Sequence, residues 1–481
     1  MVSFLALILG VSANTVHAQR SESAKQRMDA VESHLARYVT IANGRNDLMT
    51  LASQMAELGV PAVSIAAIRD GRIDWARAYG VSSLHGPPAT TRTLFGAASI
   101  SKPVTALGVL KLVEQGKIDL DTDVNQYLKR WKIPENEFTE KQKVTVRELL
   151  NHTSGIGTHN GVIYDSASSL PSLLQMLDGE TPAKTAPVRV EAVPGTKFAY
   201  ANGGYLVLCL LIEDVTEESF SHYMKQTVLQ PMGMNDSTFD APLPPKLAQH
   251  AATSYFGRGK VAPPENFIEP NLAAGGLWST PTDLAKFLIE VQREYAGTSH
   301  KVLHQRTIRA IVTQGNGQTS ARSWGLGFEV GGKPDNLYVR HGGSAYFQDD
   351  MVAYLRGGGL VVMTSGGDGG ILAEQLLRSA ATVYDFPDFK PVERAVVEVN
   401  PSSLSRFVGT YAYIEVALEG GFLTAEIPKG AKPVRLYPES PTRFFVIDQP
   451  QELDFDVDAE QNVTGVEFIT SMAHHSLKKE K

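Results

Sequence analysis

The sequence contains a single cysteine, Cys209, among its 481 residues. One cysteine excludes an intramolecular disulfide, a redox-active cysteine pair and a cysteine-based zinc site. Because Cys209 lies in the apolar run 205–212 and free cysteine is usually buried, we interpret it as a core residue. The histidines also lack the His-Glu-x-x-His spacing of zinc peptidases. The sequence therefore indicates neither a metal nor a cofactor.

Excess positive charge and long hydrophobic runs are missing as well. The formal net charge of -7 leaves no basic field that would concentrate nucleic acid or an anionic membrane surface. The apolar run 4–11 is far shorter than the roughly twenty residues that span a bilayer. We expect no nucleic-acid partner and no membrane span, and a small-molecule or peptide substrate. The sequence leaves the oligomeric state open.

The first 18 residues have the features of a signal peptide. The run 4–11 is followed by Val16-His17-Ala18, which has the small-x-Ala form of a signal-peptidase site. No lysine or arginine precedes the apolar run, which departs from the usual pattern. We predict that residues 1–18 are removed, that the mature chain begins at Gln19, and that the protein is periplasmic or secreted.

The length and the 43% apolar content predict one large core and a smaller appended domain, because single cores stop growing near ~250–300 residues. Two strand-like runs, 63–68 and 73–79, are joined at Asp70-Gly71, which favours a tight hairpin. Helical patterns follow, and strand-like runs return at 337–340, 351–355 and 360–364. This order predicts an α+β fold in which the first and last strands meet in one sheet.

Helix signals are found at four places. Residues 24–58 have a helical pattern, and 101–114 read as a buried helix with Pro103 near its start, where a missing amide is harmless. Thr145 begins a capping-box pattern, and Thr280 similarly opens a helix through Leu288.

The pattern breaks at 386–391 and again at Asn400-Pro401. The last ~80 residues lose helical periodicity and show short alternating runs, which favour β structure. We therefore predict a first domain over 19–390, a linker over 391–400 and a small all-β domain over 401–481.

The first motif with chemical potential is Ser99-Ile-Ser-Lys102. Side chains three residues apart on a helix share one face, so the hydroxyl and the amine can touch. A buried lysine loses proton affinity and can take the serine proton, while the helix start favours developing negative charge. A simple helix cap at Ser99 is the alternative. Ser476 and Lys479 repeat the spacing, but no apolar helix follows them.

Two further motifs follow in the chain. Tyr200-Ala-Asn202 can supply a phenol that shuttles protons and an amide that binds a substrate amide. The alternative is a structural role, with a tyrosine in the core and an asparagine in a turn. His341-Gly342-Gly343 follows a strand-like run, and glycine there lets a substrate backbone approach an edge strand. His159 also precedes a glycine at this spacing but lacks flanking strands.

In this order, the three motifs resemble those of the serine β-lactamase and penicillin-recognising family, namely Ser-x-x-Lys, Tyr-x-Asn and His-x-Gly. The resemblance covers about residues 40–385 and includes the stretches 148–155, 229–239 and 273–284. It implies an antiparallel sheet flanked by helices, as in β-lactamases and transpeptidases. The segment 404–411 resembles the opening of a small β-barrel-like domain appended to such hydrolases.

The resemblance also implies roles. Ser99 would attack a carbonyl, with Lys102 and Tyr200 relaying its proton; which of these two is the principal base stays open. Asn202, His341 and Gly343 would bind substrate, and the amides of Ser99 and Ser344 would stabilise the oxyanion.

By way of the resulting acyl-enzyme, the protein would hydrolyse esters, D-amino-acid peptides or β-lactams. Because His341 replaces the lysine of typical penicillin-binding proteins, we favour an esterase or peptidase. A true β-lactamase and a non-catalytic binding or assembly module are the alternatives. We expect His341 to change charge between pH 5 and 8, since its ordinary pKa is about 6.5.

Overall fold

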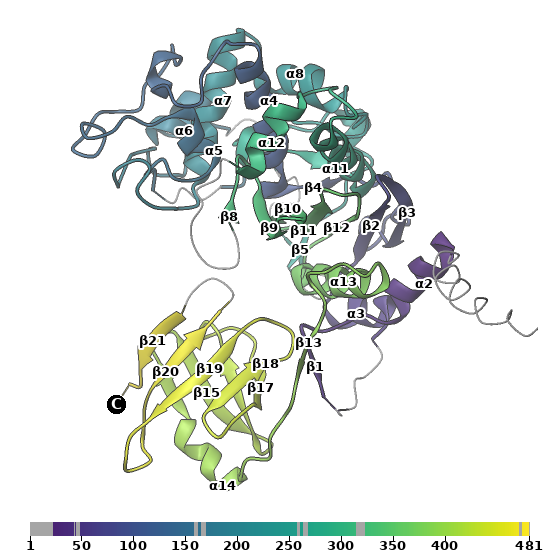
Figure 1. Cartoon of the computed structure of the whole chain (residues 1–481), viewed down its shortest axis with the longest axis vertical. Coiled ribbons are helices and arrows are strands. Elements are labelled where there is room, and N and C mark those ends of the chain that lie inside the picture. Colours follow the sequence, from purple (N-terminus) through teal and green to yellow (C-terminus); the bar gives the residue numbers. More distant parts are fainter. Residues whose placement is uncertain are drawn as a thin grey trace, which may run out of the picture.

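The computed structural model describes residues 23–42, 44, 49–157, 162–164, 170–256, 260–262, 268–313, 323–470 and 474–480. The predicted signal peptide, the cleavage site at Gln19 and His159 lie outside these residues. Figure 1 shows a large part of helices and sheet above a smaller all-β domain, coloured yellow.

The large part is built on a seven-stranded sheet. Its strands run in the order β3-β2-β12-β11-β10-β9-β8, and each is antiparallel to its neighbours. The N-terminal strands therefore meet the C-terminal ones in one sheet, as the sequence predicts. The bounds are β2 Ala62–Arg69, β3 Arg72–Gly80, β8 Ser323–Trp324, β9 Glu329–Lys333, β10 Asn336–Ser344, β11 Gln348–Tyr354 and β12 Gly359–Thr364.

The predicted hairpin between β2 and β3 is confirmed. Asp70 and Gly71 both have positive φ, 52° and 66°, which is the conformation that a two-residue type I′ turn needs.

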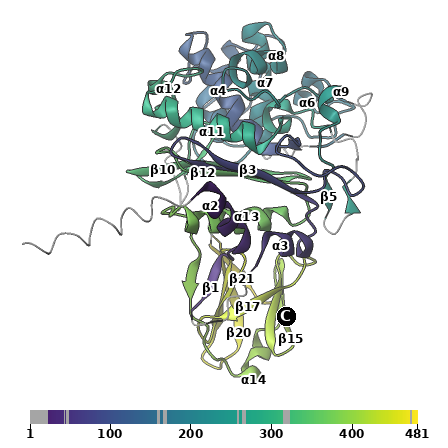
Figure 2. The ribbon, with the colours of Figure 1, turned by 90° about the vertical axis from the view of Figure 1, so that its right-hand side faces the viewer.

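Helices cover both faces of the sheet (Figure 2). The thicker layer packs around α4 Ser101–Glu114 and α7 Asn202–Thr216, whose side chains join one large apolar cluster. The other face is covered by α2 Ala24–Ser33, α3 Leu51–Glu57 and α13 Gly369–Val383. The remaining helical elements are η1 Ala98–Ile100, η2 Val124–Gln126, α5 Val146–Leu150, α6 Leu173–Asp178, α8 Phe220–Met224, η4 Lys225–Leu229, α9 Pro245–Ala248, α10 Leu272–Gly275, α11 Pro281–Ala296 and α12 Gln305–Thr313.

Local signals place several of these helices. Thr145 forms a full capping box with Glu148 at the start of α5, and Thr280 caps α11 by accepting the Asp283 N–H. Helix α11 runs past the predicted end at Leu288 because no glycine intervenes before Gly297, which ends the helix with a φ of 77°.

The prediction of helical structure over 24–58 is wrong between α2 and α3. Strand β1 Val39–Ile41 interrupts it and pairs in parallel with β13 Val392–Arg394. The Val39 N–H also donates to the Ile447 carbonyl of the C-terminal domain. Pairing with distant segments overrides the local helical preference here. Three two-stranded sheets are described in all, and their other strands are β4 Phe95–Gly96, β7 Trp278–Ser279, β5 Tyr255–Phe256 and β6 Lys260–Val261.

The C-terminal domain is an eight-stranded antiparallel sheet in sequence order, preceded by α14 Pro401–Leu404 and η5 Ser405–Phe407. Its inward side chains, among them Phe407, Tyr411 and Phe455, form a separate apolar cluster. The domain thus has its own core. Its strands are β14 Gly409–Tyr411, β15 Ile414–Glu419, β16 Phe422–Glu426, β17 Val434–Pro438, β18 Arg443–Val446, β19 Glu452–Val457, β20 Val463–Ile469 and β21 His474–Lys478.

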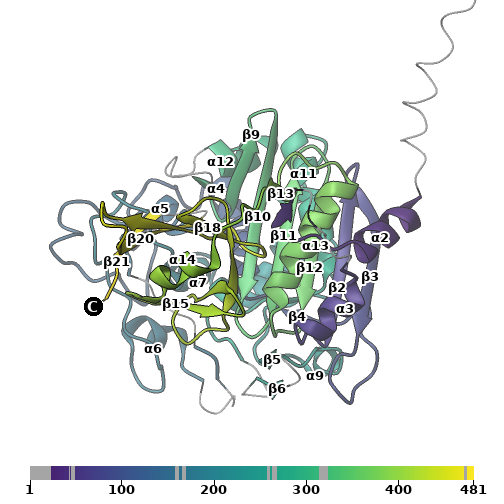
Figure 3. The same ribbon diagram turned by 90° about the horizontal axis from the view of Figure 1, so that it is seen from below.

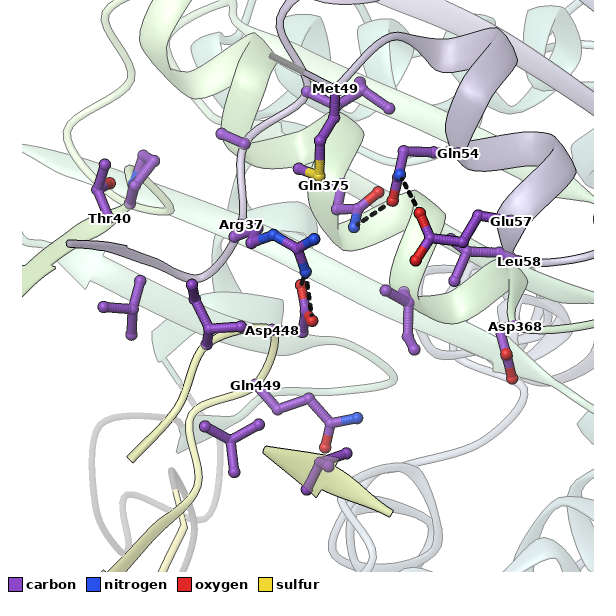
Figure 4. A pocket seen from close by; sticks show the side chains of 18 of the residues that line it. Arg37, Thr40, Met49, Gln54, Glu57, Leu58, Asp368, Gln375, Asp448 and Gln449 are labelled. Carbon is purple, nitrogen blue, oxygen red and sulfur yellow. Dashed lines mark hydrogen bonds and ion pairs between the residues drawn. The ribbon is translucent and has the colours of Figure 1, made fainter. Parts of the chain in front are cut away.

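Seen from below, α13, α3 and α2 lie beside the C-terminal domain under the sheet (Figure 3). A cavity of about 940 Å³ remains at this junction, lined by both parts of the chain. Across it, Arg37 Nη1 lies 2.6 Å from the Asp448 carboxylate; within the large part, Gln375 Nε2 donates to Gln54 Oε1 at 3.0 Å at the wall of the cavity (Figure 4). The Val39 N–H also donates to the Ile447 carbonyl across the junction, and the apolar clusters of the two parts share no residue.

We predict that a chain ending at Asn400 folds on its own, because the apolar clusters around the sheet share no residue with the cluster of the C-terminal domain. It should show one cooperative transition in a thermal melt followed by circular dichroism. A truncated chain without a cooperative transition would contradict this.

In the full chain, Asp448→Asn should lower the free energy of unfolding by at most about 1 kcal/mol, since the ion pair with Arg37 is partly exposed.

Candidate active site

Ser99 lies in the short helix η1, at the point where the chain enters the buried helix α4. The preceding residue, Ala98, has a φ of 43°, a conformation that non-glycine residues rarely adopt. Ser101 stabilises this turn, because its hydroxyl donates to the Ala98 carbonyl at 2.6 Å and accepts the Leu277 N–H at 2.9 Å. The turn presents Ser99 at the head of the helix.

Lys102 is completely buried beside Ser99. Its Nζ lies 3.0 Å from Ser99 Oγ and donates to the Ala274 carbonyl, also at 3.0 Å. The ammonium group lies 4.8 Å from the centre of the Tyr200 ring. Burial lowers the pKa of Lys102 to about 7, although the nearby Glu269 opposes the shift. The amine can therefore lose its proton near neutral pH and accept one from Ser99.

Tyr200 precedes helix α7, and the interaction of its phenol with the Ser99 side chain favours a lower pKa of the phenol. Burial nevertheless raises the pKa of this phenol well above its ordinary value, so the group is protonated at neutral pH. The His152 ring is tilted by 33° against the Tyr200 ring at 4.3 Å between centroids, and its Nδ1 accepts the Ala201 N–H at 3.2 Å. Trp324 completes the aromatic surroundings, 5.6 Å from Tyr200.

Asn202 begins helix α7 and lines the same cavity as Ser99. Its backbone carbonyl accepts a hydrogen bond from Asn271 Nδ2 at 3.3 Å, which ties it to helix α10. Among the residues that the structure describes, its Oδ1 has no hydrogen-bond partner although it is buried. A buried acceptor of this kind is available for a substrate N–H.

Strand β10 brings the third motif to Ser99. A Cβ atom at Gly343 would lie 2.4 Å from the Ala97 carbonyl oxygen, so only glycine allows this close approach to the serine turn. The neighbouring Gly342 has room for a Cβ, whose closest contact would be 3.7 Å. Ser344, at the end of β10, lines the cavity together with Ser99.

His341 is buried, 3% exposed, and its Nδ1 lies 2.7 Å from the Gly342 carbonyl, which makes Nδ1 the protonated nitrogen. Burial, reinforced by Lys102, lowers the pKa of His341 to about 3. The prediction that His341 changes charge between pH 5 and 8 is therefore wrong: the ring is neutral across that range. Its Nε2 is buried and has no hydrogen-bond partner among the described residues.

Of these residues, Ser99, Asn202 and Ser344 line a cavity of about 470 Å³. Sequence reasoning missed Glu269, whose half-buried carboxylate lines it and whose pKa burial raises to about 7. Glu269 lies four residues before the family-like stretch that begins at Ala273, but it matches no motif, so the sequence carried no signal for it. The cavity is lined by Ala98, Ser99, Val162, Ile163, Asn202, Glu269, Asn271, Ala274, Gly275, Ser344, Ala345 and Tyr346.

The model of the Beta-lactamase family matches residues 49–382. The chain belongs to this family. It is thereby a β-lactamase or penicillin-binding-protein-like serine hydrolase at the level of the superfamily. The match includes every residue of the three motifs.

The chain is similar in sequence or fold to several known proteins. The chain is 26% identical over 444 residues to penicillin-binding protein 4* of Bacillus subtilis (strain 168), which covers 86% of this chain and 94% of that protein. It is 26% identical over 242 residues to a putative D-alanyl-D-alanine carboxypeptidase of Salmonella paratyphi B, covering 47% of this chain and 54% of that one. The octameric penicillin-binding protein homologue from Pyrococcus abyssi shares the fold, with a TM-score of 0.58 and 22% identity over 89% of this chain and 98% of its own.

Two further findings concern the described part of the chain. It has no helix that is long and apolar enough to cross a membrane. It also has no cluster of three histidine, cysteine or acidic side chains arranged to hold a metal ion.

We predict opposite outcomes for the two glycines of β10. Gly343→Ala should push β10 away from the serine turn and lower the free energy of unfolding by about 1–3 kcal/mol, as overpacking typically does. Gly342→Ala should change it by less than about 0.5 kcal/mol, because its Cβ has space. Urea unfolding of both variants tests this. Equal effects would show that the Ala97 contact does not set the position of β10.

Proposed function

We propose that this protein hydrolyses esters or amides through a covalent acyl-enzyme on Ser99. The observation that carries the proposal is the buried amine of Lys102, which lies 3.0 Å from Ser99 Oγ and has a pKa of about 7. A general base is most effective when its pKa lies near the working pH, and it must be within hydrogen-bond reach of the proton that it removes.

The chemistry divides into two steps. Ser99 Oγ attacks the carbonyl carbon as neutral Lys102 takes the hydroxyl proton; the bond to the leaving group then breaks as Tyr200 gives the leaving group a proton, and Lys102 passes its proton on to Tyr200. Water next attacks the acyl ester and gives a proton to the amine of Lys102, which is neutral again. The bond to Ser99 Oγ then breaks, this oxygen takes that proton back, and the acid is released. We assign Lys102 as the principal base and Tyr200 as the proton donor, because the phenol holds its proton at neutral pH.

Other residues would bind the substrate. The free Oδ1 of Asn202 supports a hydrogen bond to a substrate N–H, and the position of Ser344 beside Ser99 supports an oxyanion site made from their two backbone amides. Preorganised donors of this kind are worth about 3–4 kcal/mol each in the transition state. The neutral Nε2 of His341 would accept one hydrogen bond from Tyr200 or from substrate.

For the substrate, we propose simple esters and D-amino-acid peptides, with β-lactams as a second class. The names of the relatives support this group, since one is a penicillin-binding protein and another a putative D-alanyl-D-alanine carboxypeptidase. A non-catalytic module would not need a lysine buried against the serine. We also propose that the protein is exported to the periplasm or outside, on the basis of its first 18 residues.

The acyl-enzyme can be tested directly. Treatment with a fluorophosphonate or a β-lactam should raise the intact mass by one adduct, and peptide mapping should place the adduct on Ser99. Ser99→Ala should take up none, while Ser476→Ala, at the exposed serine that repeats the Ser-x-x-Lys spacing, is the matched control and should be labelled like the wild type. An adduct on Ser101, Ser154 or Ser344 of the wild type would contradict the assignment.

The pH profile tests the base. Because only neutral Lys102 accepts the proton, kcat/KM for a neutral ester should rise with pH through about 7 and then level off. Lys102→Ala should lower kcat/KM by roughly 10²–10⁴-fold. His341→Gln should keep the midpoint, since His341 is neutral throughout this range. A midpoint that moves by a full pH unit in His341→Gln would show that His341 does titrate there.

A further inference from the structure

Glu269 is the single carboxylate among the described residues that line the cavity beside Ser99. The other lining side chains are apolar or neutral, apart from the ionisable phenol of Tyr346, and include no lysine, arginine or histidine. Lys102 lies beneath the cavity, with its Nζ engaged by Ser99 and the Ala274 carbonyl. Above the pKa of Glu269, about 7, the open space next to the nucleophile is thus bordered by a negative charge.

Neighbouring backbone groups hold the Glu269 carboxylate in position. Its Oε1 accepts the Asn271 N–H at 2.9 Å, and the preceding Ile268 is bridged to Tyr164 by two backbone hydrogen bonds. Gly275 leaves room for the side chain: a Cβ there would lie 3.1 Å from Glu269 Cγ and 3.5 Å from Oε2. Only one oxygen is used by the backbone, and no hydrogen bond to Oε2 is described.

No other described residue that lines the cavity carries a cation to balance Glu269. Lys102 attracts the Glu269 carboxylate from outside the lining, but its amine is neutral above its pKa of about 7, and His341 is neutral as well. Above that pH, a substrate carboxylate would therefore meet repulsion from Glu269 and no cationic partner. An ammonium group would gain a charge-assisted hydrogen bond in a site partly shielded from water, where such contacts are strongest.

Resting on the proposed hydrolase function, we propose that Glu269 determines specificity by binding a cationic amine. The preferred substrates would be esters and amides that carry an ammonium group close to the reacting carbonyl, on the acyl part or on the leaving group. Carboxylate-bearing substrates, such as β-lactams, would react with Ser99 less efficiently than these cationic ones.

Two isosteric substrate pairs test this at pH 8, above the pKa of Glu269 of about 7. The first compares β-alanyl with butyryl p-nitrophenyl ester, which differ by an ammonium in place of a methyl group. The second compares butyrylthiocholine with its neutral 3,3-dimethylbutyl thioester analogue. Within each pair the ratio of kcat/KM values cancels any effect of Glu269 on Lys102, because both substrates use the same serine and base.

We expect the wild type to favour β-alanyl over butyryl p-nitrophenyl ester by roughly tenfold, the gain typical of a hydrogen bond to a charged group. The trimethylammonium group of butyrylthiocholine has no N–H, so that substrate can gain only from attraction between the charges. Glu269→Gln should bring that ratio close to one, and Glu269→Lys should bring it below one. Glu180→Gln is the matched control, because it removes an equal charge from an exposed residue outside the cavity. It should keep the wild-type ratio.

Two results would overturn the proposal: ratios near one in both wild-type pairs, or a preference that Glu269→Gln leaves intact. Thermal melts of each variant confirm folding, and the wild-type ratios decide even if a variant is unstable. The Ser99→Ala variant distinguishes a failure of the acyl-enzyme proposal from a failure of the Glu269 proposal. If it retains turnover of all four substrates, the acyl-enzyme proposal fails, whereas Ser99-dependent turnover without charge preference refutes Glu269 alone.

Discussion

The geometry of the site depends on one buried contact, the hydrogen bond from Lys102 Nζ to the Ala274 carbonyl. A lysine with no exposed surface loses the hydration of its charge, and the carbonyl together with Ser99 Oγ replaces only part of it. The balance leaves the amine close to neutrality at ordinary pH. Helix α10, which supplies that carbonyl, also carries Asn271 and thus connects the lysine to Asn202 and Glu269.

The sequence predicts much of this arrangement, since short-range chemistry marks it. The spacing of Ser99 and Lys102, the positive-φ pair Asp70-Gly71 and the capping box at Thr145 each act within a few residues. The meeting of early and late strands in one sheet could be inferred from their order. The roles of Ser99, Lys102, Tyr200, Asn202, His341 and Ser344 were implied by the motifs, and the structure brings these residues together without itself testing their roles.

What the sequence could not predict depends on distant packing. The charge of His341 follows from burial and from a lysine more than two hundred residues earlier, so its ordinary pKa misled the prediction. Glu269 belongs to no motif, and its importance comes from its position just before helix α10, where it lines the cavity beside Ser99. Strand β1 forms against the local helical pattern because it pairs with strand β13 and donates a hydrogen bond to a carbonyl of the C-terminal domain.

Strand order also has a consequence for how the chain reaches its fold. Strand β2 is the second strand of the sheet, between the edge strand β3 and β12, and its partner residues on β12 end at Thr364. The hairpin of β2 and β3 can form at once, but its inner edge has no neighbour until some three hundred further residues have been made. Such long-range pairing is slow and leaves a strand edge open. Until β12 has been made, the inner edge of β2 can pair with a strand of another molecule, so the unfinished chain is open to association with its own copies.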